Sequence, residues 1–355
     1  MKFATLPGLT PDGRLVVVSR DLTRSIAADD IAPTLLDAIQ RWDEVEPDLT
    51  RSIAADDIAP TLIDAIQRWD EVEPDLTKRF DQLNTGNDTL DGVTAFEPGA
   101  ALAPLPRAPQ WLDGSVFQSH LDLMARALHP DRPNEPSDVP FVYQGASDDL
   151  RGPTDPIAGY HLDEGIDFEG EFGVVVDDVP IRVTDEEALE HVRLLLLIND
   201  VSLRKYAARE ITVGFGFLNA KPSTAFAPVA VTPDELGDAW RGGRVHLPLR
   251  VERSGQWFGH PHGSEMTFHF GELISHSART RRLSAGTIVG SGTVSNQDRS
   301  MGSACIAERR AIEMIDSGSP STSFLANGEL VRMEVLDEWG SSVFGEIRQA
   351  VVVTE

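Results

Sequence analysis

Two glutamates separated by one residue, Glu169 and Glu171, lie in a run whose other residues favour a β-strand. Successive side chains of a strand point to opposite faces, so both carboxylates emerge on one face, roughly 7 Å apart, and Gly170 faces the other way. Such a pair repels itself unless a cation, a shared proton or water relieves the repulsion. The pair is also compatible with the solvent-exposed face of a strand in an acidic protein.

Other acids and a histidine could complete a site around this pair. Asp200 follows the apolar run at residues 194–198, where an unpaired buried carboxylate would be costly and therefore needs a partner. It is also compatible with a helix-capping or loop aspartate. Asp113 and His120 are seven residues apart, and Asp113 with the glycine after it is typical of a turn. Neither of these two residues is specific alone.

Three further residues are compatible with chemistry and with ordinary surface roles. Lys221 follows a glycine-rich bend, so its amine could reach nearby acids or stay in solvent. Residues 291–295 indicate either a hairpin turn or a turn whose N–H groups hold an anion. Glu308 precedes two arginines and is compatible with a salt-bridged surface acid.

The order of these short motifs along the chain is more specific than any one of them. Together with Tyr143 and the segment from Asn199 to Arg204, they resemble the fumarylacetoacetate hydrolase family over about residues 100–353. The first residues of the chain resemble the start of its small N-terminal domain. The resemblance implies carboxylate ligands for one divalent cation at Asp113, Glu169, Glu171 and Asp200. Oxygen ligands of this kind favour Mg²⁺, with Ca²⁺ or Mn²⁺ as alternatives, over zinc or copper.

The same resemblance implies roles for the remaining residues. His120 would be the general base that activates a water, and Glu308 would orient it. Lys221 would stabilise a developing oxyanion or enolate. The substrate carboxylate would be held by Thr293, Tyr143 and Arg126. Ser115 and Ala207 stand where the animal fumarylacetoacetases have a tyrosine and a glutamine, which affects substrate recognition more than the reaction class.

We therefore expect a divalent-metal-dependent hydrolase of a carbon–carbon bond. The expected substrate is a small dicarbonyl acid of the acylpyruvate or fumarylacetoacetate type from aromatic compound or tyrosine catabolism, and the family implies a homodimer. Two alternatives stay open: a decarboxylase, hydratase or isomerase of a 2-oxo acid from the same family, and a non-catalytic protein in which a cation braces the fold. The histidine favours hydrolysis, because it supplies a base for water.

The N-terminal part of the chain contains an unusual repeat. Residues 2–6 and 14–19 predict a hairpin, and residues 24–50 recur at 51–77 with a single change, Leu36 to Ile63. Such close identity indicates a recent duplication or an artefact and argues against a repeat architecture, which needs at least three units. Each copy predicts a helix, at residues 32–44 and 59–71. We place a domain boundary in the Gly- and Pro-rich stretch 81–109, giving a small domain at 1–103 and a catalytic domain at 104–355.

The catalytic half predicts mostly short strands. A helix at 184–193 with the capping-box pattern of Thr184 and Glu187 leads into the buried strand at 194–198, and one helical interlude is expected at 268–281. Residues 129–162 contain six prolines and predict a long irregular stretch. The pattern indicates a β-rich α+β fold with a rolled or sandwiched sheet. The family resemblance implies a mixed β-sandwich roll.

Composition restricts the partners and the compartment. A formal net charge of −26 disfavours nucleic acid and anionic membrane surfaces. No apolar run approaches the roughly 20 residues needed to cross a bilayer. One cysteine, Cys305, cannot form an internal disulfide, and the first residues lack the apolar core of a signal peptide. We expect a cytoplasmic protein.

Overall fold

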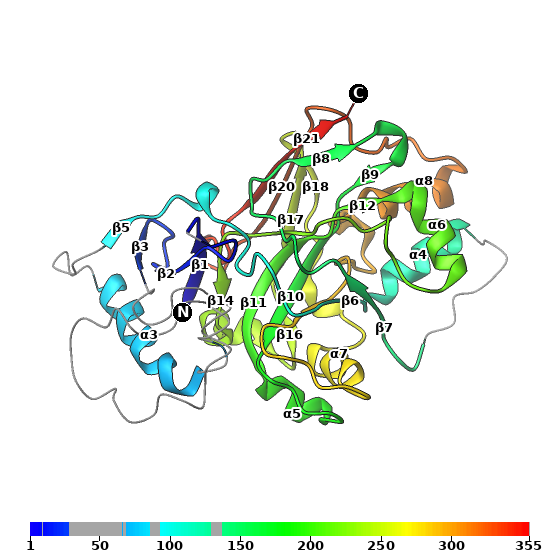
Figure 1. Cartoon of the computed structure of the whole chain (residues 1–355). Coiled ribbons are helices and arrows are strands. Elements are labelled where there is room, and N and C mark those ends of the chain that lie inside the picture. Colours follow the sequence, from blue (N-terminus) through cyan, green and yellow to red (C-terminus); the bar gives the residue numbers. More distant parts are fainter. Residues whose placement is uncertain (9, 28–65, 67–68, 86–92, 129–136, 355) are drawn as a thin grey trace.

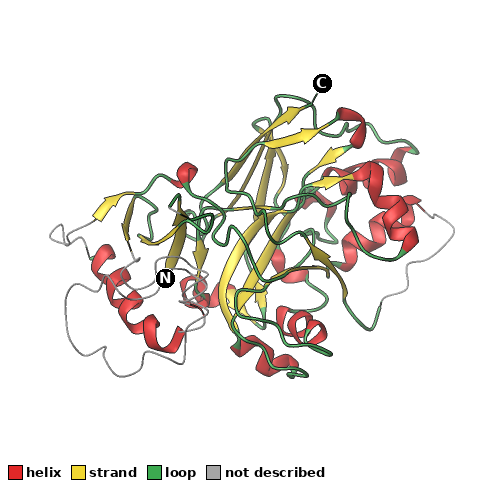
Figure 2. Ribbon diagram, viewed as in Figure 1, coloured by secondary structure: helices red, strands yellow, loops and turns green. Residues whose placement is uncertain are grey.

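The computed structural model of the chain describes residues 1–8, 10–27, 66, 69–85, 93–128 and 137–354 (Figure 1). A large sheet runs through the molecule, and a five-stranded sheet lies against one of its faces. Helices gather mainly at the periphery (Figure 2). The predicted strand-rich α+β class is confirmed. In the described part of the chain, no helix combines the length and the apolarity that a bilayer crossing requires.

The N-terminal strands form an antiparallel meander at one end of the large sheet. The predicted hairpin is confirmed: β1 (Lys2–Leu6) pairs with β2 (Arg14–Val18), which continues to β3 (Arg24–Ala27) and β5 (Val93–Ala95). The first predicted helix, at 32–44, lies outside the described residues.

The second predicted helix, at 59–71, falls within the described residues only at Ile66 and from residue 69 onward, and its end differs from the expectation. Helix α3 spans Trp69–Asn84 and runs through Pro74, whereas the sequence predicted an end at residue 71. The reason is an apolar stripe, because Val72, Leu76 and Phe80 recur at helical spacing and are all buried. Burying this stripe outweighs the hydrogen bond that the proline removes. The stretch that we interpreted as a linker therefore begins inside a helix and also contains β5.

The order of strands in the large sheet joins the N-terminal meander to the C-terminal part of the chain, from residue 104 onward. It reads β5-β3-β2-β1-β14-β11-β10-β19-β6-β7, with β13 also pairing to β11. The strands of the C-terminal part are β6 (Trp111–Ser115), β7 (Phe141–Gly145), β10 (Gly170–Val176), β11 (Val192–Asn199), β13 (Ala225–Phe226), β14 (Ala230–Val231) and β19 (Ile288–Gly290). Most pairs are antiparallel, but β19 and β6 are parallel.

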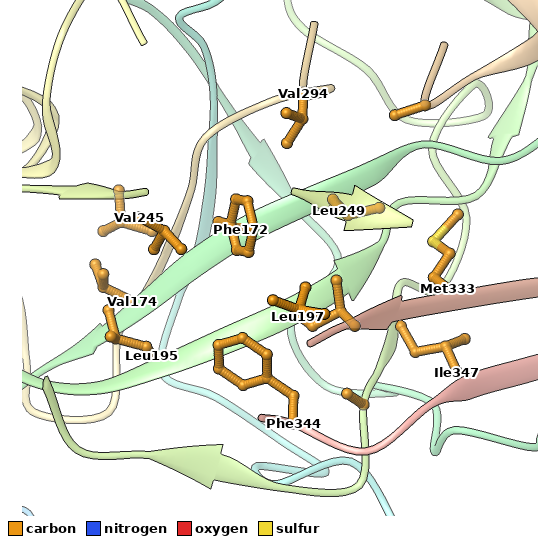
Figure 3. Packing of buried hydrophobic residues seen from close by; sticks show 14 of the residues in the cluster. Phe172, Val174, Leu195, Leu197, Val245, Leu249, Val294, Met333, Phe344 and Ile347 are labelled. Carbon is orange, nitrogen blue, oxygen red and sulfur yellow. The ribbon is translucent and has the colours of Figure 1, made fainter. Parts of the chain in front are cut away.

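The centre of this sheet is buried on both faces. Phe172 and Val174 of β10, with Leu195 and Leu197 of β11, face the second sheet, where Phe344, Met333 and Ile347 pack against them (Figure 3). The alternating residues Val175, Leu194, Leu196 and Ile198 face a second core that includes the apolar stripe of α3. The predicted buried strand at 194–198 is confirmed, and its uninterrupted apolar run reflects burial on two sides.

The second sheet covers the core that contains Phe172 and Val174. Its order is β18-β17-β20-β21-β8, and its strands are β8 (Ile157–Tyr160), β17 (Leu249–Arg253), β18 (Gln256–Gly259), β20 (Leu330–Val335) and β21 (Ile347–Val353). Two short pairs accompany it: β9 (Ile166–Asp167) with β12 (Ser202–Leu203), and β15 (Trp240–Arg241) with β16 (Arg244–Val245).

The α-helices in the described residues of the C-terminal part are α4 (Gln118–Leu128), α5 (Asp185–Glu190), α6 (Arg204–Val213), α7 (Phe270–Ser277) and α8 (Ile306–Ser317). The capping box of α5 is confirmed, since Thr184 and Glu187 bond reciprocally. The expectation of one helical interlude was wrong, because α6 and α8 were missed. Residues 129–162 are also less irregular than expected, because β7 and β8 lie within them and the prolines fall outside both strands.

Candidate metal and catalytic site

The predicted acids come from neighbouring strands of the large sheet. Glu171 lies on β10, Asp200 directly follows β11, and Asp113 lies on β6. Strand β10 pairs with β11 on one side and with β19 on the other, and Gly290 of β19 stands opposite Asp113 of β6. Residues far apart in the sequence are thus brought to one place by adjacent strands.

Asp113, Glu171 and Asp200 form the carboxylate cluster. One oxygen from each carboxylate lies within 4.8 Å of the others, and the three residues are 3%, 0% and 0% exposed. Burial, and next the charge of Asp200, raise the pKa of Asp113 well above its usual range. Burial, and next the charge of Asp113, raise the pKa of Glu171 in the same way. The cluster is therefore electrostatically strained unless protons or a cation neutralise it.

Glu171 gives the clearest sign of a cation. Both of its carboxylate oxygens are buried, and neither has a hydrogen-bond partner within the described part of the chain. Buried polar groups are nearly always satisfied, so a charged group without a partner needs an explanation. A hard divalent cation with oxygen ligands provides one, and the donor set fits magnesium, manganese or calcium.

The other two members of the carboxylate cluster are held by the protein. Asp200 accepts hydrogen bonds from the hydroxyls of Tyr143 and Thr224, both at 2.7 Å, and pairs with Lys221 at 2.6 Å. Asp113 accepts a hydrogen bond from the backbone N–H of Gly292 at 3.1 Å. These contacts fix the direction of both carboxylates before any ligand arrives.

Glu169 lies beside the carboxylate cluster and is engaged with cations of the protein. Its Oε1 pairs with Arg204 at 2.6 Å and its Oε2 with Lys221 at 2.7 Å. Burial alone would raise the pKa of Glu169, but the charges of Lys221 and Arg204 outweigh it and lower that pKa. Its predicted role as a fourth metal ligand stays a prediction. The glycine beside it does face away, because a Cβ on Gly170 would contact Leu249 and Ala304.

Lys221 is buried among acids and stays positively charged. Burial alone would lower the pKa of Lys221, but Asp200 and Glu169 outweigh it and raise that pKa. The ammonium also lies 5.7 Å from the ring centroid of Tyr143 and 6.0 Å from that of Phe217. The alternative of a surface lysine is thus excluded.

His120 and Glu308 meet as the resemblance implied. His120 Nδ1 lies 2.8 Å from Glu308 Oε2, and the two side chains are 14% and 2% exposed. His120 lies in the first turn of α4 and Glu308 in the first turn of α8, and the two helices pack together. A buried carboxylate at this position holds the imidazole in one orientation. The outer ring nitrogen is then left to act as a base.

The predicted substrate-binding residues are placed unequally. Tyr143 lies in the site through its hydrogen bond to Asp200, and burial raises its pKa well above the usual range. Thr293 is buried next to Gly292, whose N–H holds Asp113. Arg126 is exposed in the last turn of α4. It lies six residues after His120, and an α-helix turns about 100° per residue, so the two side chains leave α4 in different directions. The structure does not bring Arg126 into the site.

Four residues of the site carried no assigned role in the sequence. Arg204 was visible only as part of a motif, and Thr224 follows Lys221 by three residues. Asp167 and Phe217 gave no signal, because their partners come from other segments. Only their contacts with residues distant in the sequence identify them.

Two models of known protein families match the chain. The family model "Fumarylacetoacetate (FAA) hydrolase C-terminal" matches residues 110–352. The model "Fumarylacetoacetase N-terminal domain 2" matches residues 1–52 and 45–107. Each of the latter two stretches contains one copy of the repeated segment.

Curated relatives have more than one activity. The chain is 29% identical to a 2,4-didehydro-3-deoxy-L-rhamnonate hydrolase from a Sphingomonas species, over 43% of this chain and 52% of the relative. It is 24% identical to an oxaloacetate tautomerase from Bacillus subtilis, over 54% of this chain and 61% of the relative. The chain therefore spans between half and two thirds of the length of these relatives.

Solved structures share the fold at low sequence identity. A maleylpyruvate hydrolase from a Sphingobium species, in complex with manganese (II) ion and pyruvate, matches with a TM-score of 0.62 and 13% identity over 100% of both chains. A 5-carboxymethyl-2-hydroxymuconate delta-isomerase from Mycobacterium smegmatis matches with a TM-score of 0.51 and 17% identity, over 74% of this chain and 86% of that one. The family model covers more than half of the chain and all the carboxylate, histidine and lysine positions described above, so the chain belongs to the fumarylacetoacetate hydrolase family.

Proposed function

We propose that this protein hydrolyses a carbon–carbon bond of a β-diketo acid of the acylpyruvate or fumarylacetoacetate type, with the help of a divalent cation. The observation that carries the proposal is the contact of His120 with Glu308, on a helix that starts next to Glu169 because Cys305 and Glu169 form a β-bridge. A cation site alone would serve a binding protein equally well. A buried carboxylate behind an imidazole is the arrangement that a general base for water requires.

The cation would be held by Asp113, Glu171 and Asp200, because Glu171 has no other partner in the described chain. When bound, it would supply positive charge that polarises the carbonyl oxygens of a chelating dicarbonyl. The choice of Mg²⁺, with Mn²⁺ or Ca²⁺ as alternatives, follows from the oxygen-only donors. A relative of the same fold is known in complex with manganese (II) ion and pyruvate, which supports a cation and a 2-oxo acid at such a site.

The side chains account for the proton transfers. Glu308 accepts the Nδ1–H of His120, so Nε2 takes a proton from water while the water oxygen bonds to one carbonyl carbon. The bond from that carbon to the central carbon of the diketone then breaks, and its electron pair stays with the other half as an enolate. Lys221, kept protonated by Asp200 and Glu169, lies ready to stabilise this charge. Return of the proton from His120 to the central carbon yields a carboxylic acid and a ketone.

The test measures product formation directly. Purified protein is incubated with fumarylpyruvate, acetylpyruvate or fumarylacetoacetate, with Mg²⁺, Mn²⁺ or EDTA. The loss of enol absorbance is compared with the acids released, which are separated by chromatography. We expect cation-dependent release of a carboxylic acid, abolished by EDTA. Loss of enol absorbance without acid release would assign a tautomerase instead, and no reaction with any diketone would favour a cation-binding protein.

The base assignment is tested by His120→Ala. We expect an unchanged cation-induced rise in melting temperature, because His120 is not a ligand, and a loss of about 10²- to 10⁴-fold in kcat. His260→Ala is the control, since His260 contacts Trp257 on the second sheet and lies outside the carboxylate cluster. Hydrolysis that survives in His120→Ala would remove the base from this residue.

A further inference from the structure

Asp167 is a buried acid that the proposed reaction does not use. It is 0% exposed and ends the short strand β9, two residues before Glu169. Its carboxylate accepts hydrogen bonds from three backbone N–H groups, those of Phe168, Ile306 and Ala307, at 2.8, 2.8 and 2.9 Å. It also pairs with Arg204 through Nε at 2.8 Å. A carboxylate with four donors is held in a single orientation.

Two of these donors belong to the first turn of α8. The first N–H groups of a helix have no partner within the helix, and a carboxylate there also faces the positive end of the helix dipole. Ile306 and Ala307 both donate to Asp167, and the N–H of Glu308 next in the chain is left to the sulfur of Cys305 at 3.3 Å. Sulfur is a weak acceptor, so Asp167 is the stronger anchor of this turn. Glu308 lies within the turn that Asp167 fixes.

The fourth donor connects Asp167 to the acids of the site. Arg204 donates from Nε to Asp167 and pairs through its terminal nitrogen with Glu169 at 2.6 Å. Glu169 in turn pairs with Lys221, which also pairs with Asp200. One carboxylate therefore fixes both the helix that carries Glu308 and the guanidinium that holds Glu169.

We propose that Asp167 is a positioning residue that keeps the pair His120 and Glu308 aligned with the carboxylate cluster. The proposal rests on the proposed function, because the alignment matters only if His120 acts as a base next to a bound substrate. Asp167 has no direct contact with the carboxylate cluster, and Asp113 and Asp200 keep their own hydrogen bonds to Gly292, Tyr143 and Thr224 when it is changed. It acts through α8 and Arg204, and the reaction is expected to suffer when either connection is lost.

The main test is Asp167→Asn. An amide presents one oxygen and one NH₂ group. Where the NH₂ group faces the N–H of Ala307 and the Nε–H of Arg204, donor meets donor and these hydrogen bonds are lost. We expect kcat to fall by about 10- to 100-fold, as is typical when a supporting residue of a site is changed. KM and the cation-induced rise in melting temperature should change little. If Asp167 had only a structural role, Asp167→Asn would lower the melting temperature and leave kcat unchanged at temperatures well below that melting temperature.

The matched control is Asp163→Asn. Asp163 pairs with Lys205, the neighbour of Arg204 on α6, at 2.7 Å, and the side chains of Lys205 and Asp163 are 46% and 71% exposed. We expect wild-type kcat in this variant. If Asp167→Asn behaves like Asp163→Asn, Asp167 is not a positioning residue.

A second pair of variants covers the case in which Asp167→Asn does not fold. Ile306→Pro removes the N–H that bonds Asp167, and Ile306→Ala removes the same side chain but keeps the N–H. Proline is favoured at the first position of a helix, and Cys305 before it already has the extended conformation that proline requires, with φ −147° and ψ 159°. We expect Ile306→Pro to have the lower kcat. Equal kcat in the two variants would overturn the proposal.

A readout without turnover separates this proposal from the proposed function. In proton NMR spectra, an imidazole Nδ1–H held by a carboxylate gives a resonance that exchanges slowly enough to observe, and His120→Ala assigns it. We expect this resonance in the wild type and in Asp163→Asn, and its loss in Asp167→Asn. If Asp167→Asn loses the resonance while the wild type hydrolyses none of the substrates, the positioning role is supported and the proposed reaction is rejected. Its retention in Asp167→Asn would reject the positioning role whatever the reaction is.

Discussion

The pKa values of the two glutamates on either side of Gly170 are shifted in opposite directions. Glu169 is surrounded by Lys221 and Arg204, which lower its pKa against the effect of burial. Glu171 is surrounded by Asp113 and Asp200, which add to the effect of burial and raise its pKa. The difference follows from the partners that each carboxylate meets. It marks Glu171 as the member of the pair whose charge needs a proton or a cation beside it.

This difference predicts how stability depends on pH. Asp113 and Glu171 have raised pKa values, so between the ordinary carboxyl range and the raised values the folded protein binds more protons than the unfolded chain. The contribution of these two carboxyls to the free energy of unfolding of the metal-free protein should therefore decrease as the pH rises above the ordinary carboxyl range. A cation replaces the protons and should remove the decrease, adding about 2.7 kcal/mol at a hundred times its Kd. Urea unfolding at several pH values, with Mn²⁺ or with EDTA, measures both effects.

Glu171→Gln provides the control for this prediction. The amide is neutral at every pH, so the metal-free variant should lose less stability as pH rises, and Mn²⁺ should no longer stabilise it. Glu186→Gln, an exposed position on α5, should keep the behaviour of the wild type. Because His246, His262 and His276 have lowered pKa values and act in the opposite direction, the wild type is compared with Glu171→Gln in EDTA. An identical dependence of stability on pH in the two proteins would contradict the raised pKa of Glu171.

At the scale of elements, the parallel pairing of β19 with β6 places Gly290 against Asp113. A Cβ at Gly290 would lie 2.5 Å from Asp113 Oδ1 and 2.4 Å from the ring of Trp111. Gly290→Ala should therefore displace Asp113, weaken Mn²⁺ binding and cost about 1–3 kcal/mol of stability through overpacking. Gly99→Ala is the matched control, because a Cβ there would meet only Thr154 at 3.5 Å. Calorimetric titration with Mn²⁺ and thermal unfolding check both parts, and unchanged Mn²⁺ affinity in Gly290→Ala would contradict the steric argument.

The elements also show what sequence reasoning can and cannot reach. The apolar run at 194–198, the hairpin and the capping box depend on neighbours in the chain, and all three are present. Helix α8 was missed because its first turn is fixed by Asp167 from a distant strand, and α3 was ended too early because its buried stripe outweighs Pro74. The meeting of His120 with Glu308 was implied by resemblance to a family. The contacts of Glu169 with Arg204 and Lys221 depend on packing between segments that no local pattern connects.

At the scale of the whole molecule, one sheet joins the N-terminal strands to the site. Lys2 and Phe3 of β1 pair with Val231 and Ala230 of β14, and Val231 also stands opposite Leu195 of β11. Strand β11 leads directly to Asp200. The core on that face combines residues from both parts of the chain, including Phe3, Leu15, Leu76, Leu196 and Ile198. The N-terminal strands therefore share both backbone pairing and apolar burial with the strand that positions a proposed ligand.

This continuity predicts that the catalytic half does not fold alone. A fragment of residues 104–355 would expose the edge of β14 and the apolar face of β11, and both favour aggregation. We expect the fragment to bind a hydrophobic dye, to lack a cooperative thermal transition and to show no stabilisation by Mn²⁺. Adding a separately produced fragment of residues 1–103 during refolding should restore the transition, because it supplies β1 and the residues that cover this core. A fragment 104–355 that unfolds cooperatively at the wild-type temperature would show instead that the two parts are independent units that merely share a sheet.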